Sequence, residues 1–346
     1  MSTSTIDLRS DTVTLPTEEM YEVMRSARLG DDNLRDDPTV HELEALAAQL
    51  TGHEAALFCP TGTMANLLAT RMATKPGDGV VMPRELNMYR YGVMAWNGLQ
   101  PSFAESASGY PDVRELTQVI EWGLAGDTPP SLVVIELPHN NAGGTVTTPE
   151  YLAEVREVAH HYRLSFYLDG ARVFNAAVAL GRPVKDFTSQ ADMAMFCLSK
   201  GLSAPVGSIL CGRRDVIERA TRTRFLMGGA MRQAGLLAAC GIYALNHLVD
   251  RLAEDHENAR TLARASQRWP ALVLDQPSVD TNMVYFNVEK TGMNAAEFAA
   301  KLKEHGILVS VVDPMRVRLV THRGITAGDI ARTIEVLDHI LSLAET

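Results

Sequence analysis

Residues 193–201 read Met-Ala-Met-Phe-Cys-Leu-Ser-Lys-Gly, and this stretch decides the fold. Its apolar part predicts a buried strand, and Lys200 follows just after that strand. A lysine in this position is costly to bury as a free cation. One chemical solution is a Schiff base between its amine and an aldehyde cofactor, whereas the ordinary alternative is a solvated loop lysine. The surrounding sequence has to distinguish the two.

Short apolar runs alternate with helical patterns on both sides of this stretch. The runs predict strands at residues 55–59, 79–82, 132–137, 165–168, 193–198 and 208–211. Helical patterns lie between them at residues 63–72, 113–122, 151–161 and 171–180. This alternation predicts an α/β fold with a mostly parallel, doubly wound sheet. Ligands of such sheets bind beyond the carboxyl ends of the strands, so we expect the loops there to form one site.

The pattern changes near residue 246, where a long amphipathic helix is expected over residues 246–267. Strands at 282–288, 307–312 and 316–321 and helices at 295–305 and 327–343 then predict a small α+β domain. We expect an N-terminal arm and first helix in residues 1–37, a large cofactor-binding domain in 38–246 and a small C-terminal domain in 247–346. Thr39-Val40-His41-Glu42 reads as a capping box that opens a helix of the large domain.

The composition narrows the class of protein. The chain has 346 residues, 46% of them hydrophobic and 21% charged, and a formal net charge of −10, which argues against a nucleic-acid partner. Four cysteines show no metal-ligand spacing, so we expect reduced core residues and no metal site. Because no apolar run is long enough for a membrane and no leader pattern is visible, the sequence predicts a cytoplasmic protein without a membrane partner.

Two positions after expected strands suit a cofactor with a phosphate and a ring nitrogen. Gly62 and Thr63 lie where a strand turns into a helix, which leaves backbone N–H groups free for a phosphate. Asp169 ends another buried strand, where a carboxylate would keep a pyridine nitrogen protonated. Taken singly, a glycine turn with a threonine cap and an aspartate cap explain the same residues. Together with Lys200 they indicate pyridoxal 5′-phosphate.

Two further motifs suit an amino-acid substrate. His139 follows the expected strand at 132–137, where it would stack on a ring or transfer a proton, although a hydrogen-bonded loop histidine is the ordinary alternative. Arg316 and Arg318 lie on one face of a strand, and a guanidinium pairs with a carboxylate through two hydrogen bonds. A solvated strand face is the alternative for these arginines.

The chain resembles, nearly end to end, the low-specificity L-threonine aldolases of the aromatic amino acid β-eliminating lyase/threonine aldolase family. The matching stretches are residues 7–14, 60–66, 139–140, 168–172, 198–202, 205–208, 231–233 and 318–322. The resemblance implies the pyridoxal-phosphate-dependent transferase fold of type I, with a small amino acid as substrate. It also implies a homotetramer built as a dimer of dimers, with the site at a subunit interface.

The resemblance also implies the roles of single residues. Lys200 resembles the Schiff-base lysine and Asp169 the partner of the ring nitrogen, and both are expected to be catalytic together with His139. The expected cofactor contacts are Gly62, Thr63, Asn87, Asp169, Arg172 and Lys200. The expected substrate contacts are Ser10, Leu34, Arg172 and Arg318.

The sequence departs from the family pattern on the substrate side. The family usually reads Gly-Asp-Asp-Val-Tyr-Gly where this chain has residues 30–35, so the tyrosine is replaced by Leu34. The histidine over the cofactor ring is replaced by Asn87, a nearby glutamate by Gly92 and a lysine by Phe225. An asparagine cannot act as a base, so either His139 or a water would take that role. Leu34 and Phe225 favour a less polar or bulkier β-substituent than the methyl group of threonine.

The expected activity is cleavage of the Cα–Cβ bond of an L-β-hydroxy-α-amino acid into glycine and an aldehyde. Because the substrate side is altered, another reaction at Cα is the alternative: transaldol transfer, β-elimination, racemisation or transamination. A third possibility is a protein that binds pyridoxal phosphate without turnover. The intact set of Lys200, Asp169 and Arg318 argues against this third class.

Overall fold

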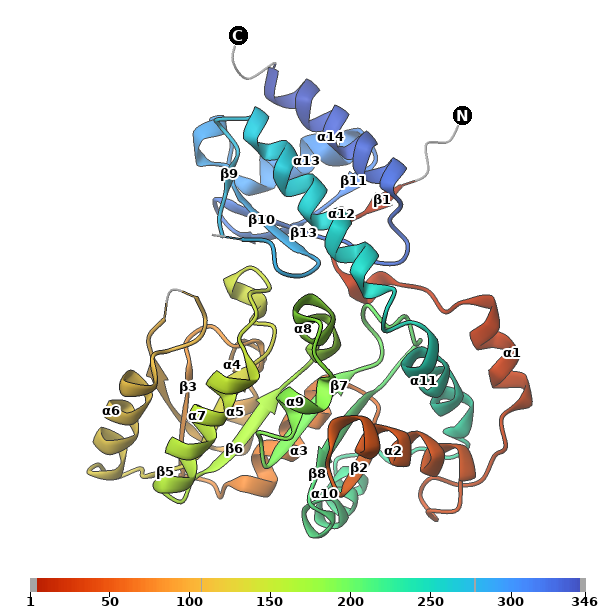
Figure 1. The fold of residues 1–346 in the computed structure, drawn as a ribbon, viewed down its shortest axis with the longest axis vertical. Helices are drawn as coiled ribbons and strands as arrows, with labels where there is room; N and C mark the ends of the chain where they lie inside the picture. The colour runs from red at the N-terminus through yellow and green to blue at the C-terminus, as the bar shows by residue number, and fades with distance from the viewer. Residues whose placement is uncertain (1–4, 107, 277, 343–346) are drawn as a thin grey trace.

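The computed structural model describes residues 5–106, 108–276 and 278–342, and a seven-stranded sheet lies at the centre of its larger part (Figure 1). The strand order is β2-β8-β7-β6-β5-β3-β4. β8 is antiparallel to both of its neighbours, and every other neighbouring pair is parallel. The expected mostly parallel sheet is therefore confirmed. The strands are β2 Ala55–Cys59, β3 Gly79–Pro83, β4 Gln100–Ala104, β5 Pro130–Glu136, β6 Ser165–Asp169, β7 Met193–Cys197 and β8 Ser208–Gly212.

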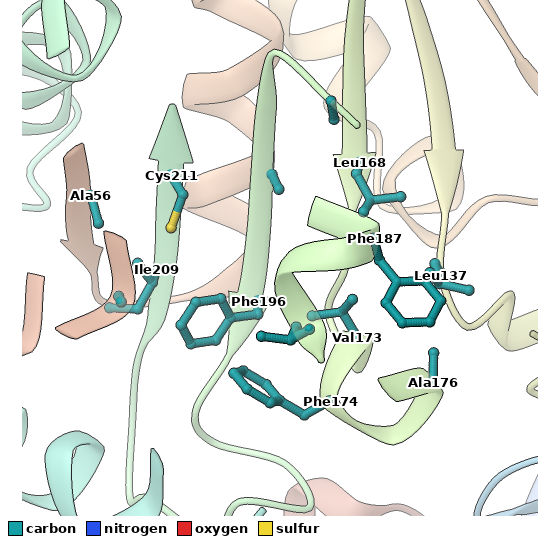
Figure 2. Packing of buried hydrophobic residues seen from close by; sticks show 14 of the residues in the cluster. Ala56, Leu137, Leu168, Val173, Phe174, Ala176, Phe187, Phe196, Ile209 and Cys211 are labelled. Atoms are coloured by element: carbon teal, nitrogen blue, oxygen red, sulfur yellow. The ribbon is translucent and has the colours of Figure 1, made fainter. Parts of the chain in front are cut away.

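Helices cover both faces of this sheet, which explains why its strands are continuously apolar. In β7, Phe196 belongs to the core cluster on one face, whereas Met195 and Cys197 belong to the cluster on the other. Figure 2 shows the first cluster, where the rings of Phe174 and Phe196 meet edge to face with their centroids 5.1 Å apart. The helices of this part are α1 Glu18–Ser26, α2 Pro38–Thr51, α3 Gly62–Ala73, α4 Asn87–Arg90, α5 Val93–Asn97, α6 Val113–Leu124, α7 Pro149–His161, α8 Val173–Leu180, α9 Val184–Thr188, α10 Arg214–Leu226 and α11 Gly235–His247.

A second, four-stranded sheet with the order β12-β13-β10-β9 lies in the C-terminal part. Its neighbouring strands are antiparallel, and a separate apolar cluster packs between this sheet and its helices. The elements are α12 Leu252–Ala265, β9 Val273–Leu274, β10 Met283–Asn287, α13 Ala295–Glu304, β11 Ile307–Leu308, β12 Ser310–Asp313, β13 Arg316–Val320 and α14 Ala327–Ser342. Short 3₁₀ segments occupy Asp11–Val13, Asn140–Ala142, Ser266–Arg268 and Glu289–Thr291.

The N-terminal arm crosses to this C-terminal part. Strand β1, Ile6–Asp7, pairs in parallel with β11, and Ile6 and Leu8 belong to the C-terminal core cluster. The following residues of the arm return to the large sheet, where the hydroxyl of Thr14 donates to the carbonyl of Lys200 at 2.9 Å. The arm therefore joins the two parts of the molecule next to the lysine.

Some local predictions were wrong. The helix expected over residues 246–267 is two helices, because α11 ends at His247 and α12 begins at Leu252. The expected strand at 307–312 is divided into β11 and β12. The helix expected to begin with a capping box at Thr39 is capped by Asp37 instead, whose carboxylate accepts the N–H groups of Thr39 and Val40. Residue 343 of the last expected helix lies outside the described residues.

Candidate active site

A cavity of about 480 Å³ opens at the carboxyl ends of β2, β5, β6 and β7, where the sequence predicted the site. Most of the predicted site residues line it: Ser10, Gly62, Thr63, Asn87, Asp169, Arg172, Lys200 and Arg318. His139 and Leu34 do not line the cavity of this chain. Asn140, from the matching stretch 139–140, lines it, and so does Glu136, which the sequence pattern did not single out.

Gly62 and Thr63 form the first turn of α3, directly after β2. The hydroxyl of Thr61 accepts the N–H of Met64 at 3.1 Å, and the earlier N–H groups of the turn have no partner within the helix. A Cβ at residue 62 would lie 2.9 Å from the sulfur of Cys197, so only glycine fits between the turn and β7. This turn is a cradle of N–H groups at a helix N-terminus, which suits a phosphate.

Asp169 ends β6 in a buried position. Its Oδ2 accepts from the amide nitrogen of Asn66 at 2.9 Å, and its Oδ1 accepts from the N–H of Ala171 at 3.2 Å. Burial and then the charge of Glu136 raise the pKa of Asp169 to about 6, and the ammonium of Lys200 opposes them. A cationic ring nitrogen beside Asp169 would favour the charged carboxylate.

Lys200 lies on the turn after β7, and its side chain lines the cavity. The structure records no ion pair of Lys200 with the acidic side chains that it describes, and its charge acts at longer range on Asp169 and Glu136. The amine of Lys200 thus has no ion-pair partner among the described residues and is available to a ligand in the cavity.

Two arginines meet at the amide oxygen of Asn140. Nη1 of Arg172 and Nη1 of Arg318 each donate to this oxygen at 3.2 Å. Arg172 is also bound through Nε and Nη2 to the carboxylate of Asp11, at 2.7 and 2.8 Å. Although burial alone would raise it, Arg172 holds the pKa of Asp11 well below its usual range. By contrast, Arg318 donates from Nη2 to the carbonyl oxygen of Arg9 at 3.2 Å, and its Nε is buried without a partner among the described residues, which leaves one donor for a ligand.

Glu136 is the site residue that sequence reasoning missed. It ends β5 beside Asp169, and its two oxygens accept the N–H groups of Asn87 and Asn140 at 2.9 and 2.8 Å. Burial raises its pKa, while these two hydrogen bonds and the charge of Lys200 oppose that rise. Glu136 therefore fixes both loops of the cavity's substrate side. A carboxylate at the end of an apolar strand was the available signal, the same one that identified Asp169.

His139 packs away from the cavity lining, against Tyr110. The two rings meet edge to face with centroids 6.3 Å apart, and Nδ1 of the imidazole accepts the N–H of Ala142 at 3.1 Å. Burial lowers the pKa of His139 to about 4, so the imidazole is neutral near pH 7 and a weak base. In the single chain, the neighbouring Asn140 and not His139 reaches the cavity.

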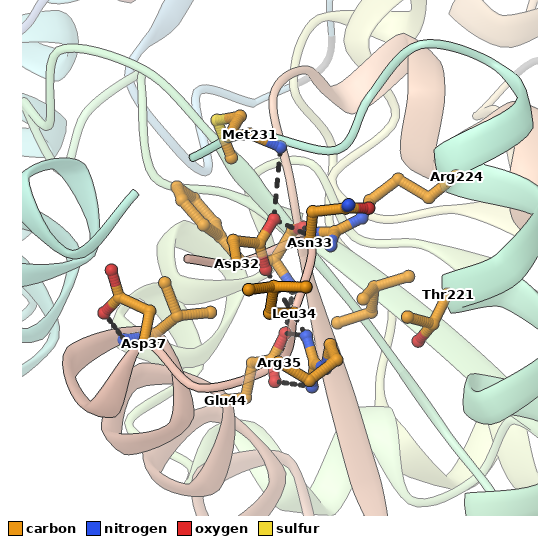
Figure 3. Close-up of polar contacts among 12 residues, drawn as sticks. Asp32, Asn33, Leu34, Arg35, Asp37, Glu44, Thr221, Arg224 and Met231 are labelled. Atoms are coloured by element: carbon orange, nitrogen blue, oxygen red, sulfur yellow. Dashed lines mark hydrogen bonds and ion pairs between the residues drawn. The ribbon is translucent and has the colours of Figure 1, made fainter. Parts of the chain in front are cut away.

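Two of the residues that depart from the family pattern, one in the stretch 30–35 and one in α10, are open to solvent. Leu34 is 69% exposed and Phe225 is 54% exposed, and neither lines the cavity of this chain. Arg35, the neighbour of Leu34, is bound to Glu44, with Nη2 2.6 Å from Oε2. Figure 3 shows this pair beside Asp32.

The residues around the cavity fit pyridoxal 5′-phosphate. The cradle at Gly62 would hold its phosphate, Asp169 its ring nitrogen and Lys200 its aldehyde, while Arg318 remains for a carboxylate. When bound, this cofactor withdraws electrons from the Cα of an amino acid and so weakens the bonds there.

Comparisons with known proteins agree with this geometry. The model of the Beta-eliminating lyase family matches residues 7–289. The low specificity L-threonine aldolase of Escherichia coli (strain K12) is 41% identical over 330 residues, which cover 94% of this chain and 96% of that protein. Low-specificity L-threonine aldolase 1 of Arabidopsis thaliana is 37% identical, with 95% and 94% covered.

Solved structures share the fold. A threonine aldolase of Leishmania major has a TM-score of 0.83 at 18% identity, and the match covers 97% of this chain and 99% of that chain. A serine palmitoyltransferase of Sphingomonas wittichii has a TM-score of 0.78 at 16% identity, with 99% and 88% covered. The expected type I fold of pyridoxal-phosphate enzymes is thus confirmed, and pyridoxal 5′-phosphate is the cofactor. The chain belongs to the β-eliminating lyase family and, within it, to the low-specificity L-threonine aldolases.

Proposed function

We propose that the protein cleaves the Cα–Cβ bond of L-β-hydroxy-α-amino acids related to threonine, releasing glycine and an aldehyde. The observation that carries the proposal is the convergence of Lys200, Asp169, the Gly62 cradle and the guanidinium of Arg318 on one cavity, where Nε of Arg318 has no partner among the described residues. The names of the relatives support the choice of reaction. Arg318 would bind the substrate carboxylate, and Lys200 would hold the cofactor through its aldehyde group.

The proton of the β-hydroxyl needs an acceptor near Asn87. The asparagine side chain lines the cavity but has no basic atom, and His139 lies outside the lining. We infer that a water molecule beside Asn87 accepts this proton. Met88, Val93 and Val206 add apolar side chains to the lining, which supports a preference for a less polar β-substituent.

A second copy of the chain is proposed to complete the site, within a dimer of dimers. Tyr91 lines the cavity and is nevertheless 74% exposed, so a large aromatic face is available for a partner at the mouth. Leu34 and Phe225 are exposed as well, and we propose that they approach the substrate across this interface. Light scattering of the purified protein tests the assembly, and a monomer that retains full activity would contradict this proposal.

The cellular location is proposed to be the cytoplasm. All four cysteines are free and buried, as expected in a reducing compartment. In the part of the chain that the structure describes, no helix has both the length and the apolar character needed to cross a membrane.

The activity is tested by incubating the cofactor-loaded protein with a panel of L-β-hydroxy-α-amino acids and measuring glycine and aldehyde. Release from threonine or phenylserine supports the proposal, and Lys200→Ala should abolish it. Lys200→Ala should also lose the cofactor that borohydride fixes covalently to the wild-type chain. Pyruvate without glycine would indicate β-elimination instead, and a changed amino-acid enantiomer ratio would indicate racemisation.

A further inference from the structure

The outer edge of β2 lies at the margin of the large sheet but is not open. β2 is the first strand in the order and pairs only with β8. Phe58 in this strand is fully buried, so its outward backbone groups need partners. Its N–H donates to Oε1 of Glu44 at 3.0 Å, and its carbonyl accepts from Nη1 of Arg224. Two side chains, from α2 and α10, thus replace the bonds of a missing strand.

These two side chains belong to a closed ring of charges, which Figure 3 shows. Nη2 of Arg224 lies 2.8 Å from Oδ2 of Asp32, and Nη1 of Arg35 lies 3.4 Å from Oδ1 of the same carboxylate. Arg35 then pairs with Glu44 at 2.6 Å, which closes the ring through Phe58. The negative charges of Asp32 and Glu44 balance the positive charges of Arg35 and Arg224. Three of the four, Asp32, Glu44 and Arg224, are buried. Such a group holds its geometry tightly because any single loss leaves a buried charge unpaired.

Phe58, through which the ring closes, lies just before the phosphate cradle in the chain. Phe58 is followed by Cys59 and then by residues 60–63, which line the cavity. The same ring also fixes the segment over the first turn of α3, because Oδ2 of Asp32 accepts the N–H of Met231 at 3.3 Å. In that segment a Cβ at Gly229 would lie 2.1 Å from the sulfur of Met64. The cradle is therefore confined between β2, β7 and this segment, and a shift of Phe58 would move it.

We propose that Glu44 and Arg224 are positioning residues for the cofactor phosphate. By binding both outward backbone groups of Phe58, they set where the N–H groups of Gly62 and Thr63 stand. The proposal rests on the cofactor cradle and not on which bond of the substrate is cleaved. It predicts that the loss of a hydrogen bond to Phe58 weakens the affinity for the cofactor phosphate, whereas the loss of an ion pair in the ring does not.

The decisive variants separate these two contributions. Glu44→Gln and Arg35→Met each remove the ion pair between residues 35 and 44 but keep an acceptor for the Phe58 N–H. Glu44→Leu removes both the ion pair and the acceptor. Arg224→Lys keeps a charge near Asp32 but replaces the fork that spans Asp32 and the Phe58 carbonyl with one shorter ammonium, which weakens the bond to that carbonyl. The dissociation constants of pyridoxal phosphate and of pyridoxal, which lacks the phosphate, are measured for each refolded or purified apoprotein by absorbance and fluorescence.

We expect Glu44→Leu and Arg224→Lys to weaken pyridoxal phosphate binding about tenfold or more and to leave pyridoxal binding within about twofold of wild type. Glu44→Gln and Arg35→Met should leave both constants within about threefold because both bonds to Phe58 remain, although Arg35→Met should lower the stability of the fold by leaving the buried Glu44 without its cation. Equal weakening for both ligands, or unchanged phosphate affinity in a folded Glu44→Leu or Arg224→Lys, would overturn the proposal. If Glu44→Leu does not fold, the pair Arg224→Lys and Arg35→Met decides. Loss of aldolase activity with normal cofactor binding would count against the proposed reaction instead.

Discussion

The carboxylate of Asp11 binds Arg172 through two hydrogen bonds, to Nε at 2.7 Å and to Nη2 at 2.8 Å. This pairing gives one of the two arginines at the cavity a carboxylate partner. Arg318 donates from Nη1 to the oxygen of Asn140 and from Nη2 to the carbonyl oxygen of Arg9, and its Nε has no partner among the described residues. The arm thus supplies a carboxylate to Arg172 and only a neutral carbonyl to Arg318, whose charge has no ion-pair partner among the described residues.

Replacing Arg318 with lysine should weaken substrate binding. Lysine keeps the charge but loses the planar fork that a carboxylate needs, so we expect KM to rise about 10- to 100-fold. Arg316→Lys is the control, because Arg316 lies on the same strand, pairs with Asp275 and Asp313, and does not line the cavity. Steady-state kinetics on threonine would contradict the assignment if both variants changed KM equally.

Glu136→Gln should loosen the substrate side of the cavity. An amide offers one acceptor oxygen for two N–H donors, so the bond to Asn87 or to Asn140 is lost. We expect kcat/KM to fall roughly tenfold while the cofactor stays bound. Glu105→Gln, which alters a surface pair with Arg84, serves as the control. A normal kcat/KM in Glu136→Gln would show that Glu136 does not support the reaction.

Asn87→His should raise the rate of threonine cleavage. The backbone at residue 87 is held by Glu136, so the substitution changes the side chain in the cavity and adds a basic nitrogen there. General acid–base groups contribute 10²–10⁴-fold in favourable geometry, and we expect a gain of up to about 10²-fold. Asn141→His places the same group on the next loop, outside the lining, and should change nothing. An unchanged rate in Asn87→His with cofactor bound would show that this position does not carry the proton transfer.

The stability of the cofactor-free protein should depend on Asp169. Its pKa is raised from 3.8 to about 6, so the folded state favours the protonated form more than the unfolded state does. The protonated form of Asp169 therefore stabilises the folded state. This stabilisation is complete below pH 4 and is lost as the pH rises through 6. Asp169→Asn removes this pH dependence. The difference in the free energy of unfolding between wild type and Asp169→Asn, measured in urea, should change by at most about 3 kcal/mol from pH 4 to pH 7.

Pyridoxal phosphate should reverse this dependence in the wild-type protein, because a protonated ring nitrogen favours the charged Asp169. Cofactor affinity is then expected to rise between pH 5 and pH 7. A pH-independent affinity in the wild type, or the same rise in Asp169→Asn, would show that another group is responsible.

Buried strands and residues at their ends were predictable from the sequence. The alternation of apolar runs and helices gave the order of the elements, and the position of Lys200 after such a run indicated its chemistry. β4 was missed because Gln100 and Pro101 interrupt its apolar pattern, as an edge strand allows. The capping box was misread because Pro38 takes the first helical position and moves the cap to Asp37.

The substrate side could not be predicted because it depends on contacts between distant segments. His139 and Asn140 are neighbours in the chain, yet one packs on Tyr110 and the other joins two arginines. Nothing in the local pattern shows which of them turns inward. The pairing of Arg35 with Glu44, nine residues later, is likewise not visible in the local pattern.

The pairing of β1 with β11 also orders events during synthesis. Ile6 and Asp7 leave the ribosome long before their partners, Ile307 and Leu308, are translated. Asp11 is part of the same arm and binds Arg172, and Asn282 supports it from the C-terminal part at 3.2 Å. A nascent chain can therefore build most of its large sheet while the arginine beside the cavity still lacks its carboxylate. Productive capture of the cofactor is expected only after β11 has emerged and paired with the arm, and a product terminated before β11 would be inactive even with Lys200 in place.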